Sequence, residues 1–201
     1  MEKRIRRVDI LDAEAVRAIY APSVSDSATS FEAVVPDLAE MERRIQTQPD
    51  RYPWLVFERD RKILGYAYAS AHRARKAYQW SAEVSVYVHH QAHRCGVGRG
   101  LYTALFEVLR WQGYVNAYAG ITLPNASSIG LHESLGFVPV GVFRQIGFKF
   151  DRWHDVMWLH LRLREDSQPP SEPLPASDLW QQESVTALFN ACAQSVRLDQ
   201  S

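Results

Sequence analysis

Closely spaced glycines and basic residues form the most chemically informative segment of the chain. It reads His-Arg-Cys-Gly-Val-Gly-Arg-Gly at 93–100, between the apolar run 83–88 and the helix-like run 101–111. Gly96 and Gly98 let the backbone turn sharply and present successive N–H groups, and a helix beginning beside them adds the positive end of its dipole. The segment therefore predicts a turn that binds a pyrophosphate.

Two common nucleotide motifs do not fit this segment. The pattern G-x-x-x-x-G-K-[ST] is absent from the sequence, and G-x-G-x-x-G fails because Leu101 occupies the position of the third glycine. The spacing thus argues against a P-loop ATP site and against a dinucleotide-binding fold.

The loop resembles the R/Q-x-x-G-x-G/A loop of the GNAT acetyltransferases, which binds the pyrophosphate of acetyl-CoA. His93 departs from that pattern, since Gln or Arg is usual there, so we expect the backbone amides to bind phosphate. The resemblance covers the chain from about Ile5 to about Leu163. Further motifs in the same order resemble the phosphinothricin N-acetyltransferase branch, and they lie at 77–80, 86–88, 101–102, 123–125, 132–137, 147–149 and 153–156.

This resemblance implies an α/β (α+β) GNAT fold and an N-acetyltransferase. The donor would be acetyl-CoA, and the acceptor the primary amine of a small amino acid such as phosphinothricin, methionine sulfoximine or methionine sulfone, which attacks directly in a ternary complex. Another amine or a protein N-terminus as acceptor, and a non-catalytic acyl-CoA sensor, stay open as alternatives. The contacts expected for acetyl-CoA are those of Val86, Tyr87, Val88, Arg94, Cys95, Gly96, Val97, Gly98, Arg99, Asn125 and Ser134.

Two residues are expected to move protons. An α-amino group with a pKa of about 8 is roughly nine-tenths protonated at pH 7, so forming the free amine costs about 1.4 kcal/mol. By the resemblance, Glu83 is the base and His132 protonates the departing thiolate or orients the substrate. A solvated Glu83 and a packing His132 are the competing interpretations. Tyr102 is a weaker candidate and is expected in the core.

The acceptor site is expected beside the predicted base. Arginine binds carboxylate or phosphinate oxygens with two donors, so Arg73 and Arg75, with Tyr78 close by, are predicted to hold the acid groups of the substrate. Alternation along a strand would place both arginines on one face, although a solvated face explains them equally well. Phe31 and the Ser-rich segment before it resemble the lid of this branch. His154 and Asp155 are expected in a hairpin turn.

Composition narrows the remaining possibilities. The 201 residues contain 23 basic and 23 acidic side chains, which argues against a nucleic-acid binder. Two cysteines and the lack of a signal peptide or long apolar run favour a cytoplasmic protein with no membrane partner. The spacing of His89, His90 and His93 predicts no metal site. A homodimer is expected from the resemblance alone.

Periodicity predicts a mixed sheet flanked by helices. We expect a GNAT domain over 1–164, a Pro-rich linker over 165–177 and an amphipathic helix within 178–201. A helix capped by Asp12 should follow the first strand, and Asp37 should begin a second helix. The predicted strands are 5–8, 54–58, 63–71, 83–88, 115–121, 138–148 and 156–163, and the later helices are 101–111 and 125–135.

Overall fold

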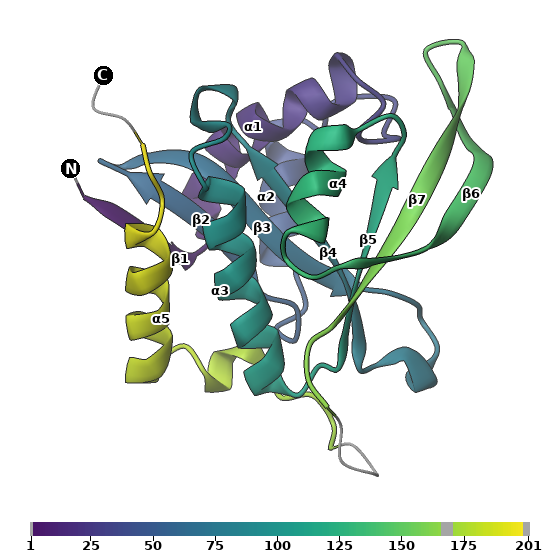
Figure 1. Ribbon diagram of the computed structural model, residues 1–201. Helices are drawn as coiled ribbons and strands as arrows, with labels where there is room; N and C mark the ends of the chain where they lie inside the picture. Colours follow the sequence, from purple (N-terminus) through teal and green to yellow (C-terminus); the bar gives the residue numbers. More distant parts are fainter. Residues whose placement is uncertain (1, 166–170, 199–201) are drawn as a thin grey trace.

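A single mixed sheet with helices on both faces forms the framework of the protein (Figure 1). The computed structural model describes residues 2–165 and 171–198. Seven strands are ordered β1-β2-β3-β4-β5-β7-β6, and all neighbours are antiparallel except β4 and β5. The strands are β1 (Lys3–Arg7), β2 (Trp54–Arg59), β3 (Lys62–Ala71), β4 (Ser81–Val88), β5 (Asn116–Thr122), β6 (Val138–Lys149) and β7 (Arg152–Arg162).

The helices divide between two hydrophobic clusters, one on each face of the sheet. One cluster contains α1 and α2, and the other contains α3 and α5. The sheet therefore separates two layers of helices, each with its own hydrophobic cluster. The helices are α1 (Ala13–Ser25), α2 (Leu38–Gln46), α3 (Val97–Gln112), α4 (Ala126–Glu133) and α5 (Glu183–Gln194).

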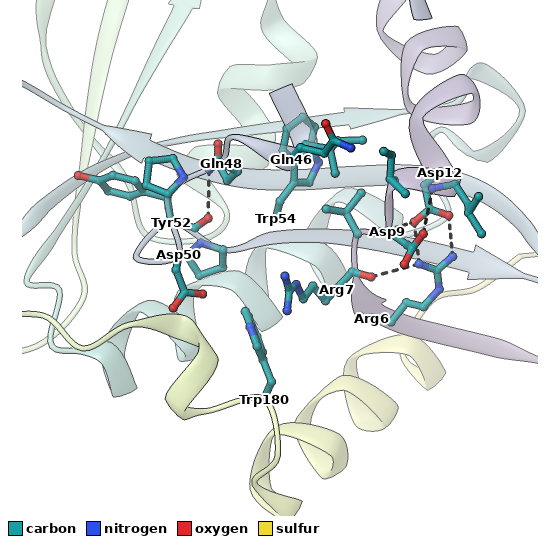
Figure 2. A pocket seen from close by; sticks show the side chains of 16 residues that line it. Arg6, Arg7, Asp9, Asp12, Gln46, Gln48, Asp50, Tyr52, Trp54 and Trp180 are labelled. Carbon is teal, nitrogen blue, oxygen red and sulfur yellow. Dashed lines mark hydrogen bonds and ion pairs between the residues drawn. The ribbon is translucent and has the colours of Figure 1, made fainter. Parts of the chain in front are cut away.

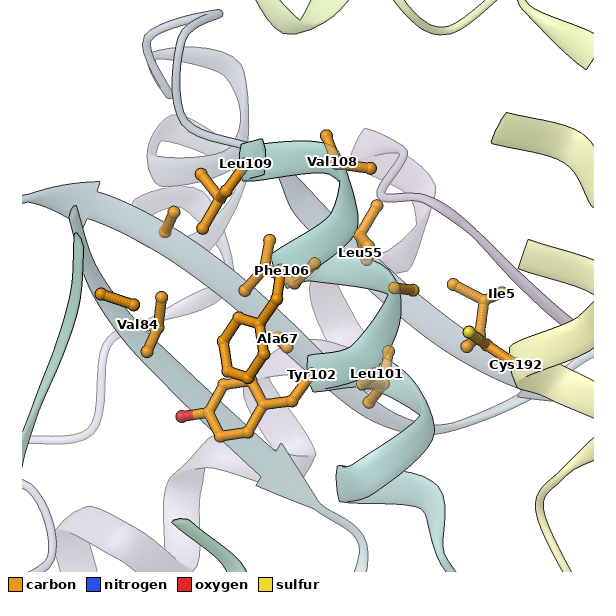
Figure 3. Packing of buried hydrophobic residues seen from close by; sticks show 14 of the residues in the cluster. Ile5, Leu55, Ala67, Val84, Leu101, Tyr102, Phe106, Val108, Leu109 and Cys192 are labelled. Carbon is orange, nitrogen blue, oxygen red and sulfur yellow. The ribbon is translucent and has the colours of Figure 1, made fainter. Parts of the chain in front are cut away.

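Packing of α3 against the middle of the sheet accounts for much of the core. Leu101, Leu105 and Leu109 are fully buried on one side of α3. Figure 3 shows Tyr102 and Phe106 next to one another on the same helix, with a ring separation of 4.9 Å. Burying a side chain of this size contributes about 1.5–3 kcal/mol, so this helix is held firmly.

The turn and cap residues explain how several elements begin, and they confirm one predicted cap and correct the other. Asp60 and Arg61 adopt φ of 48° and 67°, which gives the two-residue turn of the β2–β3 hairpin. Asp37 caps α2 by accepting from the backbone N–H of Glu40 at 2.8 Å. Asp12 does not cap α1, because its carboxylate accepts from Arg6 at 2.7 and 2.8 Å; the capping residue is Asp9, before the 3₁₀ turn that leads into the helix.

Two elements begin four residues earlier than the sequence predicts. The helix expected from residue 101 begins at Val97, because the left-handed Gly96 (φ 89°) lets the chain enter the helix immediately. Strand β7 begins at Arg152 rather than 156, so His154 and Asp155 are strand residues. Positive φ values at Phe150 and Asp151 make the turn before them.

The C-terminal segment packs back onto the domain. A 3₁₀ turn at Ala176–Asp178 leads to α5, which lies beside α3 and β1 (Figure 1). The expected apolar stripe of α5 is buried at Val185, Phe189 and Cys192. Part of the expected linker, 166–170, lies outside the described residues, and the domain boundaries stay a prediction.

Candidate active site

The two parallel strands at the centre of the sheet separate along their length. The pairing of β4 with β5 runs from Ser81 with Asn116 to Glu83 with Tyr118, whereas β4 continues to Val88 and β5 to Thr122. Beyond Glu83 the backbone amides of β4 that point away from β3 face the opening between the strands. Such donors can stabilise an oxyanion.

Side chains of β4 alternate between the two faces of the sheet. Val84, Val86 and Val88 pack with the α3 cluster, whereas Tyr87 packs with the α1 cluster. Alternation places Glu83 on the same face as Tyr87. The carboxylate thus lies on the opposite side of the sheet from the glycine loop, at the point where the strands part.

The glycine loop leads directly into the N-terminus of α3. Val97, Gly98 and Arg99 form the first turn of the helix, so their N–H groups have no acceptor within it. Gly96 precedes them and has no side chain to cap them. A 16-residue helix with an uncapped start is a favourable place for a phosphate group.

Two of the other loop residues, His93 and Cys95, have partners within the protein. The His93 imidazole hydrogen-bonds the carbonyl oxygen of Val88 at 2.9 Å, which fixes the end of β4 and leaves phosphate binding to the backbone. Arg94 is exposed with φ of 61°, and the half-buried Cys95 contacts the carbonyl of His93 through its thiol at 3.3 Å. These contacts hold the turn in its open shape.

Arg99 and Ser134 connect α3 to α4. The Arg99 guanidinium donates to Oγ of Ser134 at 2.6 Å, and that hydroxyl donates to the carbonyl of Leu131 at 2.7 Å. Asn125 caps α4 through its bond from the N–H of Ser128 at 3.1 Å and also lines a cavity of about 60 Å³ between β4 and β5. Of the two predicted contacts on α4, only Asn125 lines this cavity.

His132 lies in the wall of the same cavity and is buried. Its Nδ1 donates to the carbonyl of Ser128 at 2.7 Å, so Nε2 accepts from the hydroxyl of Tyr102 at 3.1 Å. Burial lowers the pKa of His132, although the bond to Ser128 opposes this, and burial raises the pKa of Tyr102. Tyr102 is a core residue as predicted, but its hydroxyl and the neutral imidazole form a pair beside the opening.

Glu83 has a partner that the sequence did not indicate. Oε1 of Glu83 lies 3.1 Å from Nδ1 of His72, the residue after the end of β3. Burial raises the pKa of the Glu83 carboxyl, and His72 and then Arg73 oppose the shift by favouring the charged form. The His72 ring is itself stacked on Tyr118 at 4.4 Å, which fixes its orientation.

The predicted acceptor residues near Glu83 occupy a loop rather than a strand. Because β3 ends at Ala71, Arg73 and Arg75 follow it in an irregular segment, and Tyr78 ends a 3₁₀ turn. Strand alternation therefore does not apply to the two arginines. Arg73 is close enough to affect Glu83 electrostatically, while Arg75 and Tyr78 are exposed.

Phe31 belongs to a segment that is fastened to the β6–β7 hairpin. Its ring lies against Gly147, where a Cβ would collide with it, and 6.1 Å from the ring of His154. Lys149 donates to three carbonyl oxygens of this segment at 2.6–3.1 Å, those of Val24, Ser27 and Ser30. Thr29 of the same segment lines the cavity that contains His132.

A second cavity of about 300 Å³ lies on the Glu83 face of the sheet. Arg44 contributes to its wall and pairs with Glu32 at 2.8 Å, and Glu32 accepts from the hydroxyl of Tyr20 at 3.0 Å. Tyr66 and Tyr68 form its floor from β3. Sequence reasoning missed all five residues, because only the fold brings α1, α2 and β3 together.

A larger cavity of about 780 Å³ lies at the β1–β2 edge of the sheet and shares Gln48, Pro49 and Trp54 with the second cavity. Figure 2 shows Arg7, Trp54 and Trp180 along it. Its lining includes neither Glu83 nor any other residue of β4. Across the described residues, no group of three or more His, Cys, Asp or Glu side chains could hold a metal ion.

The separated parallel strands, the uncapped helix and the carboxylate opposite it are the features that the GNAT resemblance requires of a site for an acyl-coenzyme A thioester. Residues 5–158 match the sequence profile of the Acetyltransferase (GNAT) domain. The chain therefore belongs to the GNAT acetyltransferase family. In the part of the chain that is described, no helix is long and apolar enough to cross a membrane.

Comparison with individual proteins narrows the branch of the family. The chain is 36% identical to a phosphinothricin N-acetyltransferase of Streptomyces viridochromogenes over 88% of this chain and 94% of that protein. It is also 36% identical to an L-methionine sulfoximine/L-methionine sulfone acetyltransferase of Salmonella typhimurium, over 82% and 97%. A GNAT superfamily phosphinothricin acetyltransferase from Sinorhizobium meliloti, solved with acetyl-CoA, superimposes with a TM-score of 0.79 at 31% identity, covering 88% of this chain and 99% of that one.

Proposed function

We propose that this acetyltransferase moves the acetyl group of acetyl-CoA to the primary amine of a small amino acid, with phosphinothricin, methionine sulfoximine and methionine sulfone as its model acceptors. The observation that carries the proposal is the opening between β4 and β5 with the start of α3 on one face and Glu83 on the other. Relatives that are named for these acceptors match almost their full length, which supports the substrate class.

On the donor side, the amides of 94–99 bind the pyrophosphate, and Asn125 and Ser134 contact the cofactor. For Ser134 to donate to the ligand, its hydroxyl must exchange its bond to the carbonyl of Leu131 for one to the ligand, and it can keep the bond from Arg99. The amides of Val86 and Val88, which point away from β3, then receive the thioester carbonyl. One well-placed donor of this kind contributes about 3 kcal/mol to transition-state stabilisation, more than the roughly 1.4 kcal/mol that amine deprotonation costs at pH 7.

On the acceptor side, Glu83 takes a proton from the ammonium group of the substrate. The free amine attacks the thioester carbon, the tetrahedral intermediate collapses, and the C–S bond breaks. The leaving thiolate receives the second proton of the attacking nitrogen, which is passed through the hydroxyl of Tyr102 while His132 holds that hydroxyl in place. Burial disfavours the tyrosinate, so the hydroxyl gives up its own proton only as it receives the one from nitrogen.

Acid groups of the substrate are held by Arg73 and Arg75, with Tyr78 and Phe31 closing over them. The effect of Arg73, which lowers the pKa of Glu83, supports this placement, because it puts the positive charge within electrostatic range of the base. The cavity beside Tyr68 receives the substrate side chain.

The test is a screen of acetyl-CoA turnover against the three model acceptors, a polyamine and a peptide with a free N-terminus. Thiol release with the amino-acid analogues and little with the others is the expected result. Preference for the peptide or the polyamine would replace the proposed acceptor. Binding of acetyl-CoA without turnover of any amine would favour the acyl-CoA sensor.

We also propose that the β6–β7 hairpin joins two copies of the chain. Strand β6 is at the edge of the sheet, and Val140, Phe148 and Trp153 are about three-fifths exposed. Apolar patches of this kind mark interaction surfaces. Light scattering should therefore give the mass of a dimer, and Phe148→Asp should give that of a monomer; a monomeric wild-type protein at micromolar concentrations refutes the proposal.

A further inference from the structure

The end of the C-terminal helix reaches the glycine loop. Val196, just beyond α5, is buried, and the N–H of Arg197 donates to the carbonyl oxygen of Cys95 at 2.8 Å. Nζ of Lys3 donates to the carbonyl of Val196 at 2.8 Å, which ties the same residue to β1. The segment lies outside residues 5–158, which match the family profile.

Two glycines next to the loop are in close contact with this end of the helix. A Cβ on Gly100 would lie 3.1 Å from the carbonyl oxygen of Cys192 and 3.2 Å from Cγ2 of Val196. A Cβ on Gly96 would lie 3.8 Å from Cα of Val196. The tail thus covers the side of the loop that faces away from the cleft between β4 and β5.

We infer that residues 192–197 are a positioning element for the pyrophosphate loop and raise the affinity of the enzyme for acetyl-CoA. The inference rests on the proposed function, since it assumes that the amides of 94–99 bind the diphosphate. The residues of the tail act through the loop and do not themselves contact the substrate.

The physical reason is the conformation of the loop. Arg94 and Gly96 both have positive φ, which is a costly conformation for arginine, and the loop is exposed. Its side-chain contacts are few, so its backbone must be ordered either before binding or by the ligand. A hydrogen bond to the Cys95 carbonyl and contact with Val196 order the loop in the free protein. Binding of the ligand then does not carry the entropy cost of ordering the loop.

The experiment compares two matched variants of the full chain, Val196→Ala and Val185→Ala. Both valines are buried to nearly the same degree, at 1% and 2% exposure, and both anchor the tail, but only Val196 adjoins the loop. The two variants should lose similar thermal stability. Only Val196→Ala should raise the dissociation constant of acetyl-CoA, by roughly fivefold, which is equivalent to about 1 kcal/mol.

Steady-state kinetics distinguish a positioning role from a general loss of stability, because a loss of stability alone would not change KM for acetyl-CoA selectively. In Val196→Ala, KM for acetyl-CoA should rise while kcat and KM for the acceptor stay close to wild type. A chain ended after Ser195, which lacks the Arg197 amide, should show a larger rise than one ended after Leu198. This second pair keeps the test informative if Val196→Ala does not fold.

The outcomes separate this inference from the proposed function. Wild-type protein that binds no acetyl-CoA by calorimetry overturns both. If wild type binds acetyl-CoA but Val196→Ala and Val185→Ala bind it equally well, the tail has no positioning role, and the proposed function stands. A rise in both variants alike would also overturn it, because the effect would then come from α5 as a whole.

Discussion

Replacement of Glu83 by Gln tests the role of the base most directly, because the change removes the charge and keeps the shape. Without a base, the reaction depends on amine that is already free. With an amine pKa of about 8, the free fraction is about 1% at pH 6, 10% at pH 7 and 90% at pH 9. Turnover of Glu83→Gln should therefore fall short of wild type by about 100-fold at pH 6 and tenfold at pH 7, and approach it near pH 9.

The environment of the carboxylate makes this transfer easier than it is in water. An ordinary Glu pKa lies about 3.7 units below that of the amine, a gap of roughly 5 kcal/mol. Partial burial of Glu83 raises its pKa and so narrows the gap, while the contact with His72 keeps the carboxylate charged and able to accept a proton. A base of intermediate strength is what general-base catalysis favours.

The assay is kcat/KM for the acceptor between pH 6 and 9, measured from thiol release at saturating acetyl-CoA. Glu14→Gln serves as the control, since it makes the same change on an exposed side chain of α1. A loss that is the same at every pH would refute the reasoning, because it would mean that Glu83 positions the substrate without taking its proton.

Three further outcomes follow from contacts around the site. His72→Leu should move the acid limb of the kcat/KM profile to higher pH, because His72 favours ionised Glu83. An acid limb at the wild-type pH would show that His72 does not influence the ionisation of Glu83. Lys149→Met should raise KM for the acceptor several-fold and leave acetyl-CoA affinity alone, since three carbonyls of 24–30 lose their donor. Burial lowers the pKa of His132 below its usual value of about 6.5, so at lower pH the unfolded chain binds more protons at this residue than the folded chain does. As the pH decreases below about 6.5, the free energy of unfolding should therefore fall by at most about 1.4 kcal/mol per pH unit. Chemical denaturation should show that slope in wild type and a shallower one in His132→Gln.

The sequence was sufficient to predict the elements that depend on local patterns. The β2–β3 hairpin, the helix after the glycine loop and the cap at Asp37 all form from short-range signals, and the mixed sheet follows from them. The boundaries that moved depend on single backbone angles. A left-handed Gly96 begins α3 four residues early, and the turn at 150–151 lengthens β7.

The sequence did not predict the parts of the site that depend on tertiary contacts. Nothing near His72 in the sequence indicates that it meets Glu83, since pairing of β3 with β4 places Glu83 opposite Ser70, two residues before His72. Arg44 and Glu32 likewise come together from α2 and the segment before it. The separation of β4 from β5 is a property of the sheet and has no local signal.

Side chains of β4 alternate between the two faces of the sheet, so one strand can contribute to the proposed donor site on one face and to the proposed acceptor site on the other. Val86 and Val88 belong to the hydrophobic cluster beneath the glycine loop, whereas Glu83 and Tyr87 lie on the face covered by α1 and α2. Substitutions on the α1 face can therefore change the acceptor while the donor site keeps its packing. In the proposed mechanism, the donor and the acceptor meet where β4 and β5 part. Substitutions of residues that border this opening from both faces should therefore have non-additive effects on kcat.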